Sequence, residues 1–428
     1  MPESDDSALR QSARRVIGDL RELAALTSTP DGAQRVAWGP VWQQAREWLR
    51  GKLSSLGLTP VQDAAGNIWA TLPGHSTGTV IVGSHLDSVP NGGWLDGPLG
   101  VLAALEALRR YQEHAQAGLP ATLRLVDWAD EEGARFGRSV LGSSAAAGSL
   151  VLDEVRGLRD ADGIRLEDAL RRHGVSLQSM LDARQELARI DARAYLELHI
   201  EQGPVLESLD RSAGVVIGTF GVERHRLRFV GQAAHAGSTP IASRRDAFLA
   251  AAATALECRE IARRHSRPGA GVVCTVGMVK VEPGFVTAVP GTAEIAIDQR
   301  ALDAGVLAAM FREAQDASRR FADENSVSVE WMPLFRMEPR PFDPRLIRLC
   351  EESIRSVTGD APALPSGPLH DATAMAPVMP VVMMFARSAN GLSHCKEEDT
   401  PDEHLENAIS AFLRLVDKTV ASVANGAL

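Results

Sequence analysis

The chain has 428 residues, with 45 Lys and Arg against 55 Asp and Glu, so its formal net charge is −10. Its composition, 45% hydrophobic and 23% charged, is that of an ordinary globular protein and argues against a disordered chain, a collagen or a coiled coil. The acidic balance, and the lack of a basic block with interleaved aromatic residues, argue against nucleic acid as a partner.

The N-terminal segment and the cysteines predict a cytoplasmic protein that does not enter a membrane. The first ten residues are acidic and polar, whereas a signal peptide needs a basic start and an apolar stretch. No segment approaches the roughly 20 consecutive apolar residues of a membrane span. The four cysteines are widely spaced, without the dense framework of a disulfide-stapled secreted domain.

The first half of the chain alternates helix-like and strand-like segments. Residues 8–26 and 41–56 carry apolar side chains at helical spacing. Residues 79–83 and 122–126 are short β-rich runs, each followed by a polar loop and an expected helix. This rhythm predicts an α/β fold with buried strands, in which functional loops lie at the carboxyl ends of the strands.

The rhythm changes at about residue 214. Strands are expected at 215–219, 225–230, 272–281, 292–298 and 327–331, and helices at 244–265 and 302–323. This order predicts a compact α+β insert whose sheet carries two helices on one face. The rest returns to the α/β rhythm and ends on a helix at 402–424. We therefore expect one catalytic domain formed by residues 1–213 and 330–428, interrupted by a smaller domain at 214–329.

The first cluster of chemically active side chains follows the run at 79–83. His85 closes this run, and Asp87 and Asp96 lie in the next loop. A neutral imidazole can bind a metal, and Asp87, two residues along an extended stretch, points to the same side and can orient that imidazole. Taken alone, this pair is explained as well by a structural loop histidine held by an aspartate.

The second cluster follows the run at 122–126 and contains Asp130, Glu131 and Glu132. Adjacent carboxylates repel one another, so such a cluster is stable only when it is solvated or neutralised by cations. Because neighbouring side chains diverge, one Glu can bind a metal while the other serves as a general base. A solvated acidic loop is the alternative explanation.

Two further histidines, His199 and His394, also follow probable buried strands. Together, four strand ends bring five candidate ligands: His85, Asp96, Glu132, His199 and His394. A set of N and O ligands without thiolates suits Zn²⁺, Mn²⁺ or Co²⁺ in a catalytic site with open positions, and one carboxylate could bridge two ions. The chain has no GxSxG elbow and no phosphate-binding glycine loop, which disfavours a serine hydrolase and a nucleotide enzyme.

At this point the sequence resembles the M20 peptidase family of metal-dependent amidohydrolases, in the branch that contains N-carbamoyl-L-amino-acid hydrolases, β-ureidopropionases and allantoate amidohydrolases. The resemblance runs nearly end to end. It rests on GSHLDSVPNGGWLDGPLGV, DEEGARF, LELHIEQGPVLE, GQAAHAGSTP, Asp298 with Arg300, SGPLHDA and GLSHCKEEDT. It implies a dinuclear-metal aminopeptidase-like α/β domain interrupted by a ferredoxin-like α+β domain for lid closure and dimerisation.

The resemblance also implies two divalent metal ions per subunit, with Zn²⁺ as the first choice and Mn²⁺ or Co²⁺ as alternatives. Asp96 would bridge them, with His85 and His199 on one ion and Glu132 and His394 on the other. Glu131 would be the general base, and Asp87 would support catalysis beside His85.

The substrate contacts implied by the resemblance lie in both domains. His235 would stabilise the oxyanion from the partner subunit of a homodimer, and Arg300 would bind the substrate carboxylate in bidentate fashion. The alternatives are a structural histidine at a strand end and a surface arginine. The remaining contacts would be Gln202, Thr287, Gly367 and His370.

Two departures from the family pattern touch these substrate positions. Thr287 stands where an Asn is common, which exchanges an amide for a shorter hydroxyl. Pro368 and Leu369 stand where small residues are common, which adds rigidity and bulk beside the expected pocket. Both departures leave the metal set intact and affect the identity of the substrate more than the reaction.

The leading hypothesis is therefore a metal-dependent hydrolase of linear amides that converts an N-carbamoyl-L-amino acid, or a related ureido acid, to an amino acid, CO₂ and NH₃. Allantoate or ureidoglycolate is an alternative substrate, as is an N-acyl amino acid, a dipeptide or an aryl amine. A binding or scaffolding protein on a retired hydrolase fold is the alternative from another class. Its signature would be a lost ligand or base, and neither is missing.

Overall fold

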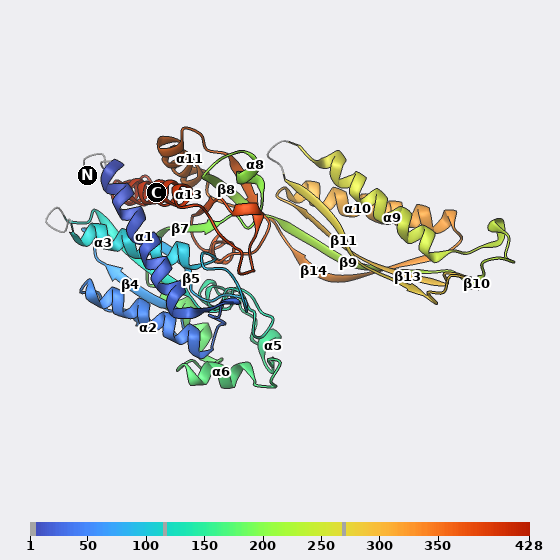
Figure 1. Ribbon diagram of the computed structural model, residues 1–428, viewed down its shortest axis with the longest axis horizontal. Helices are drawn as coiled ribbons and strands as arrows, with labels where there is room; N and C mark the ends of the chain where they lie inside the picture. The colour runs from blue at the N-terminus through green and yellow to red at the C-terminus, as the bar shows by residue number, and fades with distance from the viewer. Residues whose placement is uncertain (1–5, 114–117, 268–270) are drawn as a thin grey trace. The chain divides into compact units, whose positions relative to one another are not determined.

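The computed structural model describes residues 6–113, 118–267 and 271–428 (Figure 1). The chain forms two compact units: the larger comprises the residues up to Ile217 and from Phe342, and the smaller is Gly218–Pro341. Among the described residues, no helix is long and apolar enough to cross a membrane.

The larger unit is built on a nine-stranded sheet with four parallel strands at its centre. These are β17 (Val381–Ala386), β7 (Ala192–Ile200), β5 (Ser76–His85) and β6 (Ala121–Trp128), side by side in that order. The remaining strands are β8 (Ala213–Thr219), β15 (Arg340–Pro341) and β16 (Ala363–Ser366) beyond β17, and β4 (Ile68–Leu72) and β3 (Val61–Gln62) beyond β6. Because parallel strands end at one edge of the sheet, the loops after the four central strands meet there.

Helices cover both faces of this sheet. Successive side chains of β5 point to opposite faces and therefore enter different hydrophobic cores. Val80 and Val82 pack with Leu20, Leu105 and Phe412 of the long helices, while Ile81 enters a second core. The long helices are α1 (Asp6–Thr27), α2 (Pro40–Ser55), α3 (Pro98–Glu113), α11 (Pro344–Thr358) and α13 (Asp402–Ala424). The short elements are β1 (Ser28–Thr29), β2 (Gly32–Ala33), α4 (Leu141–Ala147), α5 (Leu152–Val155), α6 (Leu166–Arg172), η2 (Ser179–Asp182), α7 (Ala183–Ala188), α8 (Val205–Ser208), α12 (Asp371–Met375) and η4 (Ala389–Gly391).

The smaller unit is an antiparallel four-stranded sheet with two helices on one face (Figure 1). The strands lie in the order β11 (Val272–Glu282), β13 (Thr292–Ala301), β9 (Gly221–Val230), β14 (Ser328–Met337), and the helices are α9 (Ala247–His265) and α10 (Ala304–Glu324). Alternate side chains of β9 and β13, such as Phe229 and Ile297, are buried against these helices. A two-stranded sheet, β10 (Ala234–His235) with β12 (Ala288–Val289), and η3 (Ile241–Ser243) complete the unit.

The α/β class expected from the sequence is confirmed, and each segment expected as a helix or strand overlaps an element of that kind. The strand expected at 215–219 forms β8, which belongs to the large sheet, where it pairs with β17, and not to the four-stranded sheet of the insert. The smaller unit therefore begins at Gly218, later than the expected 214. It ends at Pro341, beyond the expected 329, because β14 continues to Met337 alongside β9.

Candidate metal centre

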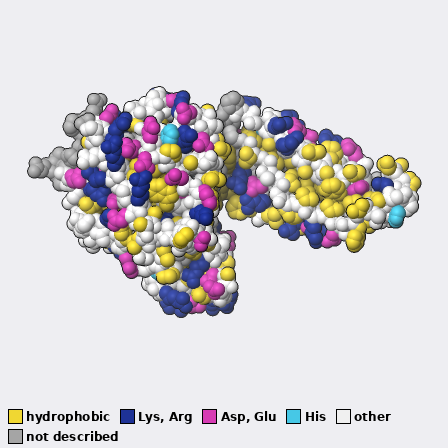
Figure 2. Space-filling view, in the orientation of Figure 1, with side chains coloured by type: hydrophobic (Ala, Val, Ile, Leu, Met, Phe, Trp, Pro, Cys, Tyr) yellow, Lys and Arg dark blue, Asp and Glu magenta, His cyan; other side chains and the backbone are white. Residues whose placement is uncertain are grey.

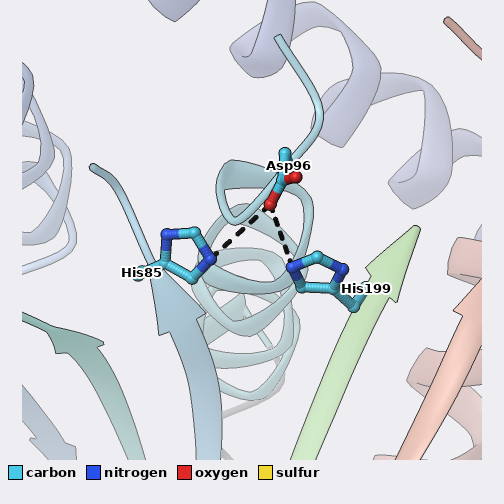
Figure 3. A group of neighbouring side chains, drawn as sticks. All are labelled: His85, Asp96 and His199. Atoms are coloured by element: carbon cyan, nitrogen blue, oxygen red, sulfur yellow. Dashed lines mark ion pairs between the residues drawn. The ribbon is translucent and has the colours of Figure 1, made fainter. Parts of the chain in front are cut away.

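Three of the five candidate ligands meet where the parallel strands end. His85 is the last residue of β5, His199 is the next-to-last residue of β7, and Asp96 lies in the loop before α3 (Figure 3). The Asp96 Oδ1 atom is 3.1 Å from His199 Nε2 and 3.7 Å from His85 Nε2. All three side chains are buried.

The other two ligands form a second group that shares Asp96. His394 Nε2 is 3.4 Å from Asp96 Oδ2 and 3.4 Å from Glu132 Oε2. In each group, the three ligand atoms lie within 4.8 Å of one another. The two carboxylate oxygens of Asp96 thus face different groups, which is the geometry that a bridging carboxylate requires.

Backbone carbonyls fix the tautomers of the two buried histidines. His85 Nδ1 donates to the carbonyl of Asp87 at 3.1 Å, and His199 Nδ1 donates to the carbonyl of Ile200 at 2.9 Å. In its neutral form, each imidazole therefore presents the lone pair of its Nε2 to the group. Within the described part of the chain, neither Nε2 atom nor Glu132 Oε1 has a hydrogen-bond partner. Buried nitrogen and oxygen atoms left without partners in this way fit a divalent cation.

Asp87 supports the acidic loop more directly than it supports His85. Its carboxylate accepts the N–H groups of Glu131 at 3.2 Å and Glu132 at 3.1 Å, whereas its Oδ1 is 3.6 Å from His85 Nδ1. The imidazole of His85 is instead held by the main-chain carbonyl of Asp87. Asp87 thus connects the loop after β5 with the loop after β6.

The site carries more negative charge than its surroundings neutralise. Burial, followed by Asp371 and Glu132, raises the pKa of Glu131 well above its ordinary value. Burial and Asp96 do the same to the pKa of Glu132. Although burial lowers the pKa of His199, the adjacent Asp96 raises it to about 9. Each of these shifts reflects clustered carboxylates that a bound cation would stabilise.

Two of the expected substrate-binding residues contact the two groups of candidate metal ligands. Gln202, which has a positive φ of 57°, places its Nε2 2.6 Å from Asp96 Oδ2. The ring of His370 is buried, with its centroid 4.4 Å from that of His199. Gly367 lies in the same larger unit, half-buried between β16 and α12.

The other three expected substrate contacts belong to the smaller unit. His235 is exposed on β10, and its Nδ1 accepts the N–H groups of Gly237 and Ser238 at 3.1 and 3.2 Å. Its proton therefore resides on Nε2, which can donate a hydrogen bond. Thr287 is exposed beside it, and its carbonyl accepts the N–H of Ala236. Arg300, on β13, donates to Asp298 at 2.8 Å.

Three polar residues at the site, the buried Glu197 and Glu398 and the half-buried Ser393, were not predicted from the sequence. Ser393 Oγ is 2.8 Å from Asp96 Oδ2 and 3.0 Å from Glu398 Oε2. Glu197 accepts from Ser84 Oγ at 2.8 Å, which connects β7 with β5. An acid two residues before His199 in a buried strand is a signal that could have identified Glu197. No local pattern distinguishes the buried Glu398 from the exposed Glu397 beside it.

Comparisons with known proteins agree with this geometry. Residues 81–418 match the model of peptidase family M20/M25/M40. The chain is 35% identical to an N-carbamoyl-L-amino acid amidohydrolase of Geobacillus stearothermophilus, over 89% of this chain and 91% of that protein. It is also 35% identical to the allantoate amidohydrolase of Escherichia coli (strain K12), over 88% and 91% of the two chains. A solved hydantoinase/carbamoylase family amidase from Burkholderia multivorans superposes with a TM-score of 0.86 at 31% identity, covering 96% of this chain and 98% of that one.

Proposed function

Because this chain belongs to peptidase family M20/M25/M40, we propose that it hydrolyses the C–N bond of an N-carbamoyl-L-amino acid or a related ureido acid. The protein is an amidohydrolase that acts on C–N bonds other than peptide bonds. The observation that carries the proposal is the pair of ligand groups sharing Asp96, with the carboxylate of Glu131 beside them. The family named from the sequence motifs is confirmed by the match.

We propose that the site binds two divalent cations, with Zn²⁺ as the first choice. His85 and His199 would hold one, Glu132 and His394 the other, and Asp96 both. When bound, such ions polarise a carbonyl and acidify a water molecule. The neutral imidazoles and carboxylates present here are ligands of this class.

Glu131 is the proposed general base. Its Oε2 atom lies 3.8 Å from His85 Nε2, at the edge of the ligand group but outside both triads. A carboxylate there can take a proton from the attacking water and return it to the leaving nitrogen. For a carbamoyl substrate, that nitrogen leaves as ammonia, and the carbamate that remains decomposes to CO₂ and the amino acid.

We propose that both units contribute residues that contact the substrate and that the smaller unit acts as a lid. The Nε2–H of His235 would stabilise the oxyanion, and Arg300, oriented by Asp298, would bind the substrate carboxylate. Gln202, Thr287, Gly367 and His370 would complete the contacts. Catalysis would then require domain closure.

We also propose that the smaller unit mediates a homodimer. Strand β11 is an edge of its sheet, and Val273 and Val279 on it are 46% and 56% exposed. Leu256 on the neighbouring helix α9 is 62% exposed, and hydrophobic side chains gather on the visible face of this unit (Figure 2). An unpaired edge beside exposed apolar side chains is suited to pairing with a second copy.

The test is ammonia release from N-carbamoyl-L- and D-amino acids, allantoate and ureidoglycolate, by protein loaded with Zn²⁺, Mn²⁺ or Co²⁺. We expect release from at least one ureido acid, abolished by a chelator and restored by the metal. Allantoate is the second candidate, because the allantoate amidohydrolase of E. coli is as similar as the carbamoylase. No release from metal-loaded protein, together with cleavage of dipeptides or N-acyl amino acids, would contradict the proposal.

A further inference from the structure

Glu398 is a buried acidic side chain that connects two ligand-bearing loops far apart in the sequence. Its Oε1 atom accepts the N–H groups of Leu95 and Asp96, both at 3.0 Å. Its Oε2 atom is 3.0 Å from Ser393 Oγ, which lies 2.8 Å from Asp96 Oδ2. One carboxylate therefore contacts the main chain of Asp96 and the residue immediately before His394.

The loop before Asp96 packs directly on this carboxylate. A Cβ atom at Gly93 would overlap the Glu398 side chain, so only glycine lets the two segments approach this closely. The buried guanidinium of Arg35, from the segment before α2, packs against the same loop. It donates to the carbonyls of Leu86 at 2.8 Å and Gly93 at 3.4 Å. Arg35 supplies positive charge beside the Glu398 carboxylate.

The two groups of ligands differ in how they are supported. His85 and His199 lie on neighbouring elements of the sheet, whereas Asp96 and His394 both lie in loops. His394 also has a positive φ of 58°, a conformation that surrounding contacts must maintain. The group that contains Asp96, Glu132 and His394 therefore depends on contacts between loops.

We propose that Glu398 is a positioning residue that fixes the Asp96 carboxylate opposite the His394 imidazole, so that both face the same cation. The role rests on the proposed metal site. Removing the carboxylate by Glu398→Ala is expected to weaken the binding of one of two Zn²⁺ ions by about 10–100-fold, the cost typical of losing a residue that supports a metal ligand. The other ion keeps the two strand-borne histidines and shares only Asp96, so we expect its affinity to fall less.

Three further variants separate positioning from charge. Glu398→Gln keeps a carbonyl oxygen for the two N–H groups and an amide for Ser393, so we expect it to restore near-normal binding. Gly93→Ala displaces the carboxylate without removing it and should resemble Glu398→Ala. Glu397→Ala removes an adjacent exposed charge and is the matched control.

The measurement is a titration of metal-free protein with Zn²⁺ against a chromophoric chelator, with the Co²⁺ absorption spectrum as a second readout and circular dichroism as the folding control. Unchanged binding of two ions by Glu398→Ala would overturn the role of Glu398 alone. If Glu398→Ala does not fold, the other two variants still test the role of Glu398. Equal Zn²⁺ affinity in Glu398→Gln and Gly93→Ala would overturn that role. A wild-type chain that binds no cation would instead overturn the proposed function.

Discussion

At the scale of single residues, Glu131 is the side chain whose chemistry is most open to test. Its amide isostere, Glu131→Gln, preserves shape and the backbone contact with Asp87 but cannot take a proton. We expect this variant to keep its bound metal and to lose turnover by at least about 100-fold, the contribution typical of a general base. Ammonia release and metal content, measured on the same preparation, check both parts.

Glu154→Gln is a suitable control for this substitution, because it removes an exposed acid on α5 outside the ligand groups. It should leave both measurements unchanged. Turnover near the wild-type rate in Glu131→Gln would assign the base to another carboxylate. Loss of metal as well as turnover would make Glu131 a ligand.

At the scale of elements, helix α11 packs against β17, the strand that leads to the His394 loop, and its N-cap is testable. Asp343 accepts the N–H groups of Arg345 at 2.8 Å and Leu346 at 3.3 Å. Replacing it by Ala should lower the free energy of unfolding by about 1 kcal/mol, whereas Asn should retain most of the cap. Urea unfolding followed by circular dichroism measures the difference.

The same cap predicts a pH dependence. Burial raises the pKa of Asp343, but hydrogen bonds from Arg345 outweigh it, and the pKa is lowered overall. A lowered pKa means that the stabilisation is present above the unfolded value of about 3.9 and is lost as the pH falls through the folded value. The difference between wild type and Asp343→Ala should therefore shrink below about pH 4. A difference that grows there would contradict this account.

The elements also show what the sequence can and cannot predict. The strand ends after 79–83 and 122–126 were predictable, because short β-rich runs followed by polar loops are local patterns, and the ligands His85 and Glu132 follow from them. The pairing of β8 with β17 was not predictable from composition, because it joins segments about 170 residues apart. The contact of Glu398 with Asp96 spans 302 residues and exists only in the folded chain.

At the scale of the whole molecule, the proposed dimer makes a prediction that no single subunit can satisfy. Homodimers of Glu131→Gln and homodimers of His235→Ala should each be inactive. If His235 acts in the partner's active site, however, a mixed dimer of the two variants has one complete active site. One site then has the base from one chain and the histidine from the other. The second site lacks both.

Co-expression of the two variants with different affinity tags, followed by two purification steps, isolates the mixed dimer. We expect it to release ammonia at about half of the wild-type rate, because one of two symmetric sites is intact. Wild-type chains carrying the same two tags give the reference rate. If His235 served its own subunit, neither site would be complete and the mixed dimer would be as inactive as its parents. A monomeric wild type in light scattering would rule out the arrangement before any mixing.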